Sequence, residues 1–120
     1  MRPKHAITVR LPWADQLLRG TKPAEFRNWR LGERFVGVPL LLHAGRWDDG
    51  QRVYPEIPTG SLIAVVVFGE PEGLSSGPWA WAWPVQSILP LTRPIPARGM
   101  PGLWRPPEGI LAQVEILPPF

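Results

Sequence analysis

The 120-residue sequence contains no cysteine, which excludes disulfide bridges and cysteine-ligated metal centres. It has only two histidines, His5 and His43, so a multi-histidine zinc site is not expected. We expect no metal and no cofactor. Long apolar stretches are also missing, and the most apolar run, Ser61 to Phe68, is too short to span a bilayer. No apolar segment of signal-peptide length follows the basic N-terminus. We therefore expect a cytoplasmic protein without a membrane partner.

Proline and glycine are abundant instead, with 17 prolines and 12 glycines. This density of helix breakers excludes long helices and an all-helical bundle. The apolar fraction of 44% and the charged fraction of 19% are typical of a folded chain, and the length predicts one domain over residues 1–120. Asparagine and methionine are scarce, which fits a heat-adapted protein. High-GC codon usage explains the composition equally well.

The positive charge is concentrated in the first half of the chain. Residues 1–54 carry ten Lys or Arg against five Asp or Glu, whereas residues 55–120 carry three against five. Eleven of the thirteen cations are arginine, whose guanidinium group matches phosphate geometry and stacks on aromatic rings. The basic half also contains Trp13, Phe26, Trp29 and Trp47. This combination favours a nucleic-acid partner, although codon usage accounts for the arginines as well.

The spacing of apolar residues predicts short strands and one short helix. The helix is expected over residues 11–20, with Pro12 in its first turn and Gly20 as its stop. Residues 45–60 are expected to form a long loop, and the proline-rich residues 90–107 to be irregular. The predicted strands are 5–9, 24–29, 36–44, 61–68, 79–89 and 110–117. A mainly β (α+β) fold, a small β-barrel with one or two short flanking helices, is the economical arrangement of these elements.

Alternation along two of these strands predicts which side chains share a face. Trp79, Trp81 and Trp83 fall on one face, which we assign mainly to the core. Glu25 and Arg27 share a face, and Phe26 is expected to point the other way, into the core. Lys22, on the turn after the helix, can then converge with Glu25 and Arg27 on one wall of a cleft. An ion pair that braces the turn is the structural alternative.

Residues 20–27, Gly-Thr-Lys-Pro-Ala-Glu-Phe-Arg, fit the GxKxxExR signature of ASCH domains, which belong to the PUA-like superfamily. Three further blocks resemble this family in the same order: residues 7–14, residues 40–45, and Trp83 with residues 95–104. Together they cover nearly the whole chain. The resemblance implies a PUA-like β-barrel with a cleft that binds RNA or another nucleic acid.

In that cleft, the resemblance implies that Lys22 and Arg27 contact phosphates or base edges and that Glu25 orients them. Neighbouring residues complete the expected nucleic-acid interface. They are Thr21 beside the motif lysine, His43 at the end of a strand, Arg46 and Trp47 at the loop entry, and Arg98 and Arg105 at the flank of the cleft. Each of them also has an ordinary structural interpretation, as a turn residue, a core histidine, a lid or a solvated surface charge.

Two other kinds of function remain open from the sequence: an enzyme and, as the third possibility after nucleic-acid binding, a protein-interaction module. The chain resembles a small group of ASCH-like amidohydrolases that act on acetylcytidine, with Lys22 and Glu70 as the matching catalytic residues. Glu25, however, stands where that group has a threonine. Ribonuclease activity has also been proposed in the family, although its residues have no secure match here. The third possibility is a protein-interaction module whose cleft serves no nucleic acid.

Overall fold

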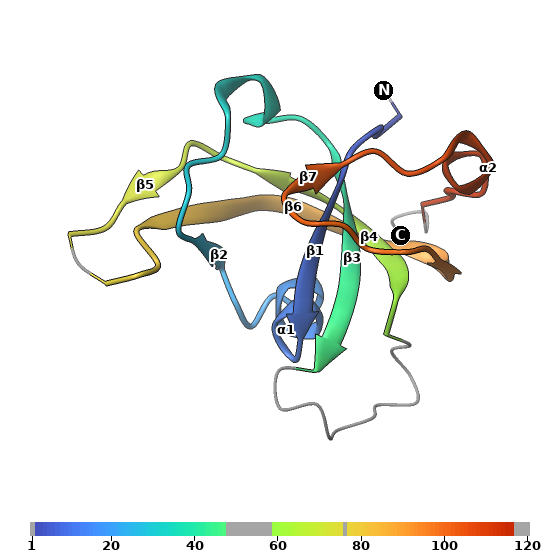
Figure 1. The fold of residues 1–120 in the computed structure, drawn as a ribbon, viewed down its shortest axis with the longest axis horizontal. Helices are drawn as coiled ribbons and strands as arrows, with labels where there is room; N and C mark the ends of the chain where they lie inside the picture. Colours follow the sequence, from blue (N-terminus) through green and yellow to red (C-terminus); the bar gives the residue numbers. More distant parts are fainter. Residues whose placement is uncertain (1, 48–58, 76, 117–120) are drawn as a thin grey trace.

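The computed structural model of the chain describes residues 2–47, 59–75 and 77–116 (Figure 1). These residues form a mainly β fold with two short α-helices, as the sequence predicts. No helix among them has the length and apolar character needed to cross a bilayer. The strands are β1 (Ala6–Leu11), β2 (Ala24–Arg27), β3 (Leu40–Trp47), β4 (Ser61–Phe68), β5 (Glu72–Gly73), β6 (Trp81–Pro96) and β7 (Leu103–Trp104). The helices are α1 (Trp13–Arg19), α2 (Glu108–Leu111) and the 3-10 turn η1 (Glu33–Phe35).

The strands form one curled sheet in the order β2-β6-β4-β3-β1-β7, with β5 pairing on β6. β1 and β3 are parallel, and all other pairs are antiparallel. The long β6 carries the curvature, because it pairs with β2 at its start and with β4 along the rest of its length. The sheet curls into a half-barrel whose front contains β1 and β7 (Figure 1). β4 lies between β3 and β6 and is buried along almost its whole length, as its apolar sequence predicts.

Two predictions about the second half of the chain are wrong. β6 does not stop near residue 89 but continues to Pro96, with Pro90 opposite Ala64 and Pro96 opposite Ser61. Register shifts along the β4–β6 pair accommodate these prolines, because a bulge removes the need for a regular ladder of N–H donors. The final strand expected over 110–117 does not form within the described residues 110–116: Ile110 and Leu111 belong to α2, and a single bridge pairs Leu91 with Ile116.

The helix α1 ends as predicted at Gly20, whose φ of 78° lies in the left-handed region that favours glycine. Pro12 is the residue before the helix. After Gly20, the backbone N–H groups of Thr21 and Lys22 both donate to the carbonyl oxygen of Gln16, at 3.0 and 3.1 Å. This turn fixes the backbone of Lys22 beside the helix and directs the chain into β2.

Each face of the sheet has its own core. One face packs against α1 through side chains such as Ile7, Leu42 and the fully buried Trp83. The other face, with Ala6, Leu41 and Leu62 among its buried residues, is covered by the C-terminal region that contains α2. Alternate residues of β1, β3 and β4 therefore serve opposite cores, which explains why these strands are apolar on both faces.

The predicted tryptophan face is only partly correct. Trp83 is fully buried and makes edge-to-face contacts with Trp29 and Phe68, at centroid distances of 4.7 and 5.5 Å. Trp81 is half-buried beside this cluster. Trp79 precedes the strand and is 58% exposed, so it does not belong to the core.

Candidate functional site

A groove with a volume of about 790 Å³ lies between β1 and the α1–β2 segment. Its β1 side is formed by Thr8, Val9 and Arg10, and its other side includes the GxKxxExR motif. Residues 100–102, just before β7, and Trp79 complete the lining. β1 and β2 are not neighbours in the sheet order, so the groove follows the seam where the curled sheet does not close on itself.

Three motif side chains meet at this seam around one carboxylate. Lys22 Nζ donates to Glu25 Oε1 at 3.0 Å, and Arg27 Nε donates to Glu25 Oε2 at 2.9 Å. Glu25 is only 4% exposed, so both of its oxygens carry a charged partner, as a buried carboxylate requires. The structure therefore brings together the three residues that the sequence spacing placed on one wall.

Arg27 also joins the two sides of the seam. Its Nη2 donates to the backbone carbonyl oxygen of Thr8 in β1 at 2.6 Å. One guanidinium group thus orients the carboxylate of Glu25 and ties β2 to β1, which a fork of several donors in one plane makes possible. The ion-pair role and the groove-lining role of the motif are both present in the same side chains.

The prediction that Phe26 points into the core is wrong. In the β2–β6 register Glu25 lies opposite the buried Trp83, whereas Phe26 lies opposite Ala82 and is 41% exposed. Glu25 therefore takes the interior face, which its two cationic partners permit. Phe26 lines the groove, where Lys22 Nζ lies 5.5 Å from its ring centroid and 5.6 Å from that of Trp13. The ammonium group is held between two aromatic rings as well as by the carboxylate.

The apolar side chains around the groove are unusually exposed. Large apolar residues normally bury most of their surface, and a group of exposed ones at a concave site indicates a binding surface. The exposed fractions are 58% for Trp79, 51% for Met100, 41% for Phe26 and 37% for Trp13. Four such side chains at one groove give it faces on which a planar ligand can stack.

His43 lies beneath the groove and does not line it, because it is only 2% exposed. Its Nε2–H donates to the carbonyl oxygen of Ala97 at 2.7 Å, since a carbonyl can only accept. Its Nδ1 is then an acceptor, to which the hydroxyl of Thr8 donates at 3.1 Å. Thr8 Oγ1 in turn accepts a hydrogen bond from the indole Nε1–H of Trp104 at 3.1 Å. Burial lowers the pKa of His43, in agreement with this neutral tautomer. The network supports Thr8 from below.

The structure places the other predicted residues as follows. Thr21 lines the groove, but its hydroxyl donates to the carbonyl oxygen of Gln16 at 3.3 Å, as in an ordinary turn. Arg46 and Arg98 are exposed and do not line the groove. The side chain of Trp47 lies outside the described part of the structure, although its backbone belongs to β3. Arg105 is exposed and lines a different pocket, beside α2.

Lys22 and Glu70 do not form a pair. The exposed Glu70 accepts from Arg30 Nη2 at 2.5 Å, and Lys22 Nζ is held by Glu25. The hydrolase interpretation requires the two to meet, and the structure gives each another partner. Within residues 2–47, 59–75 and 77–116, no three His, Asp or Glu side chains are grouped as metal ligands would be.

Sequence reasoning missed the aromatic and apolar part of the site. Trp13 was noted as one of the aromatic residues of the basic half but was not placed at the cleft, Trp79 was assigned to the core, and Met100 fell in a segment expected to be irregular. The position of Trp79 directly after Pro78, outside the strand, was the available signal that it does not share the alternation of Trp81 and Trp83.

Comparison of the sequence with protein-family models gives no match, and comparison with curated proteins gives none at a significant level. The likeness to ASCH domains therefore rests on the sequence blocks described above. The groove and the cluster of Lys22, Glu25 and Arg27, called the triad below, are observations that do not depend on that likeness.

Proposed function

We propose that this chain is an ASCH-type module of the cytoplasm that binds single-stranded RNA in the groove along the β1–β2 seam. The observation that carries the proposal is the pairing of a fixed cationic wall with an exposed aromatic rim at one groove. Lys22 and Arg27 are held in place by the buried Glu25, and Trp13, Phe26 and Trp79 remain open to solvent. Proteins that bind single strands combine these two features, because bases stack on rings and cations neutralise the backbone.

The charge balance of the groove supports an anionic ligand. Two cations share one carboxylate, which leaves a net charge of about +1 at the triad. Lys22 has three N–H donors and Arg27 has five, so the contacts to Glu25 and Thr8 leave further donors for a ligand. Arg10 adds a third cationic side chain, on the opposite side of the groove.

The size of the groove supports a ligand of one or a few nucleotides. Its volume of about 790 Å³ lies in the range of sites that enclose a small organic molecule. A base stacked on Trp79 or Phe26 would place its phosphate within the positively charged part of the groove. Gln16, which also lines the groove, offers an amide for hydrogen bonds to base edges. The Thr8 hydroxyl is already bonded to His43 and Trp104, so it can accept only one further hydrogen bond.

Fluorescence anisotropy with short labelled RNA tests this proposal. The Trp79→Ala variant removes an exposed ring, so it should weaken binding by about 5- to 150-fold, which corresponds to about 1–3 kcal/mol for one stacked base. Leu89→Ala is the matched control, because Leu89 is 39% exposed on β6 and does not line the groove. Equal affinities of the two variants would contradict the proposal, and so would affinity that does not fall with salt. The same sequence as DNA shows whether 2′-hydroxyl groups contribute.

A further inference from the structure

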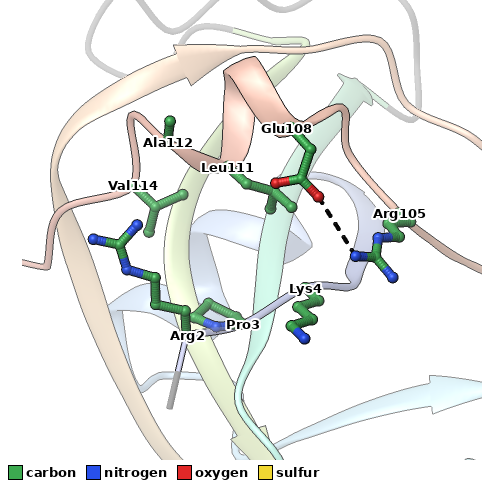
Figure 2. Close-up of a pocket in the computed structure, with 8 residues that line it drawn as sticks. All are labelled: Arg2, Pro3, Lys4, Arg105, Glu108, Leu111, Ala112 and Val114. Carbon is green, nitrogen blue, oxygen red and sulfur yellow. Dashed lines mark hydrogen bonds and ion pairs between the residues drawn. The ribbon is translucent and has the colours of Figure 1, made fainter.

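A second hollow lies beside α2, between that helix and the N-terminal segment that leads into β1 (Figure 2). Its volume is about 160 Å³, too small for a nucleoside but sufficient for a phosphate group. Leu111 and Val114 contribute apolar walls, and the cations Arg2, Lys4 and Arg105 stand around it. We call these three side chains the basic cluster.

The basic cluster is only partly neutralised. Glu108 Oε1 lies 3.5 Å from Arg105 Nη2, and both side chains are largely exposed, so this ion pair is weak. Three cations against one carboxylate leave a net charge of about +2 at the pocket. Burial lowers the pKa of the adjacent His5, and the positive charges of Arg34, Arg105 and Lys4 lower it further.

The basic cluster and the groove lie at opposite ends of one pair of strands. β1 and β7 are antiparallel, with Ala6 opposite Trp104 and Ile7 opposite Leu103. Residues 8–10 and 100–102 line the groove, whereas residues 2–4 and Arg105 line the pocket. β7 is the last strand in the sheet order, and its outer edge runs from one site to the other.

The distance between the two sites suits a single strand. Gly102 and Arg105 are three residues apart, or about 10 Å along an extended chain. A stacked nucleic-acid strand advances about 3.4 Å per nucleotide, so about three nucleotides cover this distance. A strand held in the groove by its bases would present its next phosphates to Arg105 and Lys4.

We propose that the basic cluster is a phosphate-binding site that receives the backbone of a single-stranded nucleic acid as it leaves the groove along β7. The inference rests on the proposed function of the groove and extends its footprint. Glu108 acts against binding, because its carboxylate competes with phosphate for Arg105. The cluster contributes charge without base contacts, so it adds affinity and no sequence preference.

Oligonucleotide length separates the two sites. A three-nucleotide RNA can fill the groove but cannot also reach the cluster, whereas an eight-nucleotide RNA reaches both. The Arg2→Gln, Lys4→Gln, Arg105→Gln triple variant should bind the octamer about tenfold more weakly than the unchanged protein and the trimer equally well. The salt dependence of octamer binding should also decrease, by about 0.7 in the slope of log K against log salt for each lost contact.

Two single substitutions sharpen the test. Glu108→Gln removes the competing carboxylate, so it should tighten octamer binding about two- to fivefold and leave trimer binding unchanged. Arg93→Gln is the matched control, because Arg93 is exposed on β6 and lines neither site. If the triple variant and Arg93→Gln bind the octamer with the same affinity, the inference is overturned. Trimer binding to the groove in that case would leave the proposed function intact.

Inorganic pyrophosphate tests the cluster without nucleic acid. In NMR titrations it should shift the backbone amide resonances of positions 4, 105 and 111, and the same three positions should not shift in the triple variant. If pyrophosphate binds at the cluster while neither RNA binds the protein, the proposed function fails and the site serves another phosphate ligand, which overturns the inference as stated. Absence of any shift at the cluster overturns it directly, whatever the groove binds.

Discussion

The Glu25→Gln substitution is the sharpest test of how the seam is held together. Glu25 is 4% exposed and binds Lys22 at 3.0 Å and Arg27 at 2.9 Å. Glutamine has nearly the same shape, but its amide oxygen can accept from only one of the two cations and its NH₂ group faces the other. The substitution therefore leaves two neighbouring cations without their common counter-ion.

The expected loss of stability follows from the burial of the three side chains. Removal of one partner from a fully buried ion pair costs about 3–5 kcal/mol. The side chains of Lys22 and Arg27 keep 16% and 21% exposure, so water relieves part of that cost. We expect a decrease of about 2–3 kcal/mol in the free energy of unfolding. With an unfolding entropy of about 2.1 cal/mol/K per residue, the melting temperature should fall by roughly 8–12 °C.

Thermal unfolding followed by circular dichroism measures this change. Glu70→Gln is the matched control, because Glu70 is 69% exposed in its pair with Arg30 and should lose less than about 1 kcal/mol. If the two variants melt within about 2 °C of each other, the triad does not hold the seam, and the argument from burial is refuted.

Two further predictions concern the network beneath the groove. In Gly99→Ala the added Cβ would lie 2.8 Å from His43 Cε1 and 2.9 Å from Thr8 Oγ1. Urea titration should therefore show a decrease of about 1–3 kcal/mol in the free energy of unfolding. Gly109→Ala is the control and should show no decrease, because its added Cβ has no neighbouring atom within 4 Å. Because burial lowers the pKa of His43, the unfolded chain binds a proton below about pH 6.5 that the folded chain does not, and stability should fall as the pH drops through that range. The fall should be smaller in His43→Gln, and an identical pH profile would mean that His43 titrates normally.

The sequence predicted the elements that local signals determine. The strand of residues 5–9, the helix stop at Gly20 and the central strand of residues 61–68 each follow from alternation, a left-handed glycine or a continuous apolar run. β6 was mispredicted after residue 89 because proline normally excludes a regular ladder, and only the pairing with β4 reveals the bulges that accommodate it. Likewise, residues 110–117 alternate well enough for a strand, but among the described residues 110–116 only Ile116 pairs, through one bridge.

The candidate site divides in the same way. The motif spacing placed Lys22, Glu25 and Arg27 together, because the three residues lie within six positions and their proximity depends only on the local path of the chain. The groove is completed by β1 and α1, which precede the motif, and by Trp79 and residues 100–102, which lie about 55 to 75 positions further along the chain. No local pattern predicts the approach of these later segments. The face of Phe26 was mispredicted for a related reason. Hydrophobicity favours phenylalanine over glutamate inside, and only the two cations at the seam reverse that order.

The seam explains why one set of side chains serves both the fold and the groove. A closed barrel would join β1 and β2 by backbone hydrogen bonds and leave no groove between them. Here Arg27 connects the two strands through its side chain, so β1 and β2 are held together at one point and the groove between them remains accessible to a ligand. The consequence is a limit on charge: cations that are already bound to Glu25 and Thr8 offer a phosphate less than free cations would. Under the proposed function, most of the affinity at the groove would come from stacking on Trp79, Phe26 and Trp13, and the stronger electrostatic attraction would come from the basic cluster beyond β7.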